Sequence, residues 1–152
     1  MHAVDERQKA VLYRSGAGPC DPTFDPVAYN AQFELSRLEE CCSALPEFRP
    51  WMRGVAKRVV DLLLPFRGFW YYHPAQHGSA SMKAVLPALT GRGYGDLDIQ
   101  DGNTASLEFL RVHHGGATEQ ERQRVRQQLE EYCGRDTEGM VEIVDGLRTL
   151  AD

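Results

Sequence analysis

Tyr132 and Asp136 are the pair of residues in this sequence whose types and spacing best suit chemistry. They lie in a run from Ala117 to Leu150 whose apolar residues recur at helical spacing. Side chains four residues apart share one face of a helix, and here that face is the apolar stripe of the run. A carboxylate on such a stripe needs a metal ion, a cation or several hydrogen-bond donors, or else it must stay protonated.

Gly134 leaves a second interpretation of Asp136 open. If Gly134 ends one helix, Asp136 becomes the N-cap of the next, and its carboxylate accepts hydrogen bonds from backbone N–H groups alone. The residue pattern by itself does not decide between the functional carboxylate and the capping residue.

Glu34 is the second candidate carboxylate. It falls in the first turn of a helix predicted to begin after Asn30, the expected N-cap, and to stop at Pro46, and a short strand is expected over residues 26–30. A negative charge in the first turn is favoured by the helix dipole, which is the simpler explanation of Glu34.

Ser79 and Lys83 form a candidate anion site. Residues 78–83 open a short helix that Pro87 ends or kinks, and the free N–H groups and positive dipole at such a start attract phosphate. The same residues also describe an ordinary helix start. The pattern further predicts helices over 48–64 and from Asp101 to His114, with a loop over 90–102 before the second of these.

An aromatic run, Phe69 to Tyr72, lies within residues 66–72 and predicts a short strand or an extended ledge. Aromatic rings can stack on nucleobases, although such clusters more often belong to a core. His73 and His77, together with two later histidines, suggest zinc, but the intervening proline and the lack of a matching cysteine or carboxylate pattern argue against it.

Composition limits the class of protein. The 152 residues suit one domain, and we expect an irregular N-terminal arm over 1–25 followed by a single domain over 26–152. A net charge of −5 argues against a protein that simply coats polyanions, but it does not exclude a nuclease. The four cysteines form no Cys-x-x-Cys pair, and no apolar run reaches membrane-spanning length. We therefore expect a cytoplasmic protein that does not bind membranes.

Two motifs of the sequence resemble those of a known superfamily. Asn30-x-x-Phe33-Glu34 resembles the second motif of the ribonuclease H-like 3′–5′ exonucleases, and Tyr132-x-x-x-Asp136 resembles their third motif. The ordered set of short motifs between Val27 and Leu150 is similar to the C-terminal part of a bacterial family described as domain of unknown function 2779. This resemblance implies an α/β, predominantly helical chain with a partial ribonuclease H-like (exonuclease-type) fold that lacks its N-terminal strands.

The resemblance also implies roles for these residues. Glu34 and Asp136 would be ligands of Mg²⁺ or Mn²⁺, and Tyr132 would orient or help to deprotonate the attacking water. Ser79 and Lys83 would contact phosphate, and two further residues, Asn30 and Asp61, would support the site or serve structure alone.

The first motif of the superfamily, Asp-x-Glu on a strand, is not found upstream of Asn30. We therefore expect a truncated or split 3′–5′ exonuclease-like domain with weak or no activity alone, which a partner chain or homodimer would complete. The alternative is a non-catalytic helical module that binds protein or nucleic acid.

Overall fold

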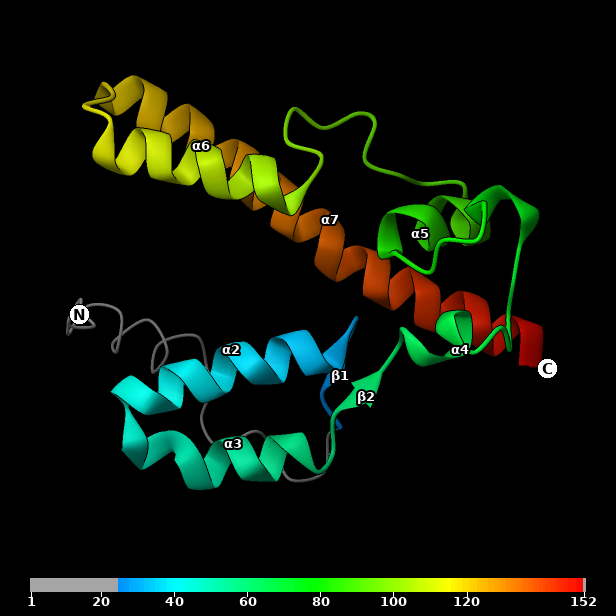
Figure 1. Ribbon diagram of the computed structural model, residues 1–152. Coiled ribbons are helices and arrows are strands. Elements are labelled where there is room, and N and C mark those ends of the chain that lie inside the picture. Colours follow the sequence, from blue (N-terminus) through cyan, green and yellow to red (C-terminus); the bar gives the residue numbers. More distant parts are fainter. Residues whose placement is uncertain (1–24, 152) are drawn as a thin grey trace. The chain divides into compact units, whose positions relative to one another are not determined.

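The computed structural model describes residues 25–151 and is predominantly helical, with one small parallel sheet (Figure 1). Its residues cluster into two compact units that divide between Leu64 and Pro65. This observation confirms the α/β, mainly helical class. The expected arm over residues 1–25 lies almost entirely outside the described residues, and the single domain over 26–152 stays a prediction.

The first unit is a helical hairpin joined to a two-stranded sheet. Its elements are β1 (Val27–Ala28), α2 (Ala31–Ala44), the 3₁₀ turn η1 (Pro46–Phe48), α3 (Arg49–Ala56) and β2 (Val60–Asp61). β1 and β2 are parallel, with Val27 opposite Val60. The strand and helix expected around Asn30 are therefore confirmed, and α2 ends just before Pro46 as the sequence indicated.

The helix predicted over 48–64 was wrong in its second half. α3 stops at Ala56, and the chain then turns and enters β2, where the Val60 N–H donates to the Pro26 carbonyl at 2.8 Å. The β-branched pair Val59 and Val60 favours an extended backbone, and pairing with β1 supplies hydrogen bonds that a helix would otherwise provide.

The second unit is organised around one long helix. Its elements are α4 (Leu64–Arg67), which begins at the boundary, η2 (Pro74–Gln76), α5 (Met82–Thr90), α6 (Gly102–His114) and α7 (Glu119–Ala151). Both α5 and α6 pack along α7 (Figure 1). Val85 and Leu86 of α5 and Ile143 of α7 have no exposed surface, so the centre of this unit's core lies between these two helices.

α7 runs without interruption through Gly134. The interpretation in which Gly134 ends a helix and Asp136 caps the next is therefore wrong. Glycine in a helix interior costs only about 1 kcal/mol relative to alanine, which the packing of α5 and α6 along α7 offsets. Tyr132 and Asp136 consequently share one face, as the continuous helical interpretation required.

The aromatic run over 66–72 does not form a strand. Residues 64–67 make the single turn α4, and Phe69 adopts the left-handed conformation with φ 56°. The loop predicted over 90–102 and the helix that follows Asp101 are both present, and the Asp101 carboxylate accepts from the Thr104 N–H at 2.9 Å. No helix among residues 25–151 is long and apolar enough to cross a membrane.

Candidate functional site

Asp136 is bound by a tyrosine from a distant part of the chain. The Tyr94 hydroxyl, in the loop between α5 and α6, donates to Asp136 Oδ1 at 2.6 Å. Tyr94 is buried, whereas Asp136 on α7 is half-buried. The partner expected for this carboxylate is thus a phenol. Its hydroxyl stabilises the carboxylate by donating a hydrogen bond to it.

Tyr132 and Lys83 complete this group of residues. The Tyr94 and Tyr132 ring centroids lie 6.1 Å apart, and Lys83 Nζ lies 5.9 Å from each of them. We call these four residues, Lys83, Tyr94, Tyr132 and Asp136, the tyrosine–aspartate cluster. Three of them were candidates from the sequence, and the second unit brings those three together.

The two tyrosines are held in the protonated form. Burial, followed by the charge of Asp136 and a hydrogen bond with it, raises the pKa of Tyr132 to about 12. Burial and the hydrogen bond to Asp136 also raise the pKa of Tyr94. At neutral pH, Tyr132 can therefore orient a water molecule through hydrogen bonds, but it is a poor base for removing a proton.

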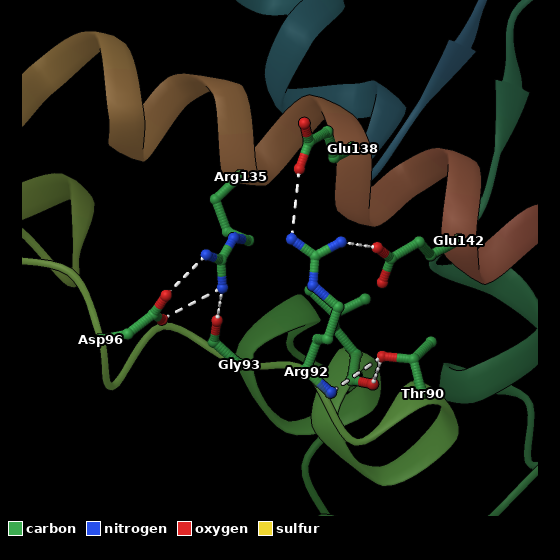
Figure 2. A network of polar contacts seen from close by, with 8 residues as sticks. Thr90, Arg92, Gly93, Asp96, Arg135, Glu138 and Glu142 are labelled. Carbon is green, nitrogen blue, oxygen red and sulfur yellow. Dashed lines mark hydrogen bonds and ion pairs between the residues drawn. The ribbon is translucent and has the colours of Figure 1, made fainter.

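Tyr94 was not among the candidate residues indicated by the sequence. Polar contacts fix the loop that carries it (Figure 2). Arg135 of α7 forms an ion pair with Asp96 at 2.8 Å and donates to the Gly93 carbonyl. Arg92 forms ion pairs with Glu138 and Glu142, also on α7. The available signal was an isolated aromatic residue within a glycine-rich loop, but nothing local to that loop indicates which helix it contacts.

Asn30, Glu34 and Asp61 lie in the first unit, so the tyrosine–aspartate cluster contains none of them. Glu34 is exposed in the first turn of α2, as a dipole partner would be. Asp61 Oδ1 accepts from the Asn30 N–H at 3.0 Å and from the Leu63 N–H at 2.9 Å. These bonds hold Asn30 in its left-handed conformation, φ 69°, and give both residues a structural role at the strand ends.

Ser79 does not belong to the cluster. Its hydroxyl accepts from the Ser81 N–H at 3.2 Å and donates to the Ser81 hydroxyl at 3.1 Å, which shapes the turn before α5. Lys83 is the second residue of α5, and its ammonium lies beside the two tyrosine rings. The structure therefore places these two candidates at different sites.

The residues that the structure describes do not fit a two-metal centre. Between residues 25 and 151 there is no group of three or more histidine, cysteine, aspartate or glutamate side chains that could hold a metal ion. One oxygen of Asp136 already accepts from Tyr94. The same finding weighs against the histidine-based zinc site, and His73 Nδ1 instead accepts from the Ala75 N–H at 3.2 Å.

Comparison with known families gives one match. Residues 9–81 match the model of a family described as Domain of unknown function (DUF2779), so the chain is similar to that family over this segment. Neither the curated proteins nor the solved structures contain a match. The matched segment includes Asn30 and Glu34, whereas Tyr132 and Asp136 lie beyond it.

Proposed function

We propose that this chain is part of a metal-dependent 3′–5′ exonuclease-like domain with weak or no activity alone. In this proposal Glu34 and Asp136 are carboxylates inherited from a site for Mg²⁺ or Mn²⁺, and nucleic acid is the substrate. A partner chain or a second copy supplies the remaining acidic residues.

The observation that carries the proposal is the pairing of Tyr132 with Asp136 on successive turns of α7. A long helix fixes both side chains on one face, which is where the third motif of the exonucleases requires them. Lys83 adds a cation beside the pair, which suits an anionic substrate. In the first unit, Glu34 follows a parallel strand at the start of a helix, the context of the second motif.

The number of carboxylates argues for weak activity. A two-metal mechanism uses several acidic side chains to hold the two metal ions, which in turn clamp the attacking and leaving oxygens, and the motifs supply two such side chains. The hydrogen bond from Tyr94 leaves Asp136 with one oxygen outside that bond. We therefore expect this chain to bind divalent metal weakly.

A nuclease assay tests the proposal. The full chain is incubated with Mn²⁺ and with single-stranded DNA or RNA that carries a label at its 5′ end. We expect at most slow shortening from the 3′ end, which Asp136→Asn abolishes because the amide cannot replace a carboxylate ligand. Asp145→Asn is the matched control, since Asp145 is exposed on the same helix.

Two results would count against parts of the proposal, and a third would reveal contamination. Fast Mn²⁺-dependent digestion lost in Asp136→Asn would overturn the claim of low activity while supporting the ancestry. Digestion that survives Asp136→Asn would come from a contaminating enzyme. Cleavage within the strand instead of from its 3′ end would contradict the exonuclease assignment.

The Tyr94–Asp136 hydrogen bond favours one alternative function. A carboxylate that a buried phenol satisfies can serve the structure of the second unit alone, and the chain would then be a non-catalytic helical module that binds protein or nucleic acid. In that case Asp136→Asn lowers the thermal stability but alters no nuclease activity.

A further inference from the structure

We propose that the segment following α4 is a binding site for single-stranded nucleic acid, with Phe69, Trp70 and Tyr72 as a stacking ledge for the bases. We call these three residues the aromatic ledge. The inference goes beyond the proposed function, because it concerns binding by residues outside the tyrosine–aspartate cluster and needs no metal ion. The ledge lies wholly within the second unit.

The three side chains of the aromatic ledge are exposed to solvent. Phe69 is 66% exposed, Trp70 is 78% exposed and Tyr72 is 46% exposed, although aromatic side chains contribute most when buried. Exposed aromatic residues clustered in one short segment mark a binding surface more often than isolated ones do. The sequence left open whether this run belongs to the core, and the structure places three of its rings at the surface.

The backbone holds these three rings toward solvent. The Trp70 N–H donates to the Pro65 carbonyl at 2.8 Å, and the same carbonyl accepts from the Tyr71 N–H at 3.3 Å. Tyr71 is the anchor, since its ring packs edge-on against buried Phe66 with centroids 5.7 Å apart. Phe69 keeps φ at 56°, a conformation that bulky residues rarely adopt and that is often found at binding sites.

Polar side chains lie beside two of these rings. Phe69 and Tyr72 line a pocket of about 190 Å³ together with Arg67 and Ser79. The described residues that line it include an arginine and no carboxylate, although the chain carries a net charge of −5. Two aromatic rings beside a cation and a hydroxyl suit the bases and phosphates of a single strand, and Trp70 borders a separate hollow with Pro65 and Tyr71.

Hydrogen bonds hold another part of the pocket lining in place. Buried Gln76 accepts from the His73 N–H at 2.7 Å and donates to the Ser79 carbonyl at 3.2 Å. These bonds fix the turn over residues 73–79 before any ligand arrives. A preformed wall lowers the entropy that binding must overcome.

Binding is measured by the fluorescence anisotropy of a labelled thymidine oligonucleotide and of the matching uridine RNA. The full chain is used at low salt with EDTA, so that failure of the metal-site proposal does not affect the result. We expect roughly micromolar affinity for the single strands, in the range of sequence-independent binding. A duplex binds more weakly, because its bases are already stacked.

Variants then locate the site. Trp70→Ala should weaken binding about tenfold, the effect of losing one stacked base, whereas Trp70→Phe keeps a ring and most of the affinity. Arg67→Gln should reduce the salt dependence by about one phosphate contact. Phe109→Ala, at a 52% exposed phenylalanine on α6, is the matched control and should bind like the unaltered chain.

Three outcomes overturn the inference. The first is the absence of saturable binding to either single strand. The second is an equal loss of affinity in Trp70→Ala and Phe109→Ala. The third is self-association in sedimentation that Trp70→Ala abolishes while oligonucleotide binding persists, which would make the aromatic ledge a contact between copies of the chain.

Discussion

Asp136 shows how one side chain can satisfy two different explanations. On α7 it is four residues from Tyr132, as an exonuclease motif requires, and Tyr94 donates to it as a structural partner would. The carboxylate does not need a metal ion to be stable where it lies, because a hydrogen bond to a charged acceptor contributes about 1.5–3 kcal/mol. What else Asp136 can bind therefore depends on the carboxylate oxygen that does not accept from Tyr94.

We predict that the raised pKa of Tyr132 lowers the free energy of unfolding at high pH. Unfolded Tyr132 loses its proton near pH 10.0, whereas the folded state keeps it until about pH 12. Between these values the folded state binds more protons, so the free energy of unfolding falls as pH rises. We expect a decrease on the order of 1 kcal/mol, given the partial exposure of the site to solvent.

Urea unfolding at a series of pH values measures this decrease. Tyr132→Phe should reduce the slope above pH 10, and the slope that remains includes the contribution of Tyr94, whose pKa is also raised. If Tyr132→Phe keeps the full slope, another group is responsible.

At the scale of elements, α5 and α7 come unusually close at glycines. A Cβ atom at Gly139 would lie 2.8 Å from Leu86 Cδ2, and one at Gly146 would lie 2.9 Å from Leu89 Cδ2. These glycines are seven residues apart and so lie on one face of α7. Their missing side chains make room for α5, which carries Lys83 to the cluster.

Gly139→Ala and Gly134→Ala should have opposite effects. Alanine is favoured over glycine in a helix by about 1 kcal/mol, and no described residue lies within 4 Å of a Cβ at Gly134, so Gly134→Ala should be stabilised by about 0.5–1 kcal/mol. At Gly139 the fully buried Leu86 leaves no room, and overpacking lowers the free energy of unfolding by about 1–2 kcal/mol. Denaturant titration of both variants measures the difference. Equal stabilisation by both would show that α5 does not pack tightly on α7.

At the scale of the whole molecule, the proposed metal ligands belong to two different units. We expect Mn²⁺ to bind weakly and to broaden backbone NMR signals selectively around Asp136 and around Glu34, because paramagnetic relaxation acts on nearby nuclei. Asp136→Asn should remove the effect on α7 and Glu34→Gln that on α2. Broadening spread over all exposed acidic residues would indicate non-specific binding and contradict the inherited site.

How much the sequence predicts depends on the range of the interactions involved. α2, α6 and α7 follow from apolar periodicity and from terminal residues such as Asp101 and Pro46, and these signals act within a few residues. The helix predicted over residues 57–61 and the strand considered for residues 66–72 were wrong. Pairing with β1 overrode the helical preference of residues 57–61. Hydrogen bonds to the Pro65 carbonyl fix a turn in residues 66–72 in place of a strand.

Helical spacing alone shows that Tyr132 and Asp136 share a face and that this carboxylate needs a partner, because helical periodicity and the cost of burying charge depend on nearby residues. The identity of the partner, Tyr94, 42 residues away, follows from the folded structure. So does the exposure of the aromatic ledge to solvent. Both depend on how loops are held against distant helices, and no spacing within the chain encodes such contacts.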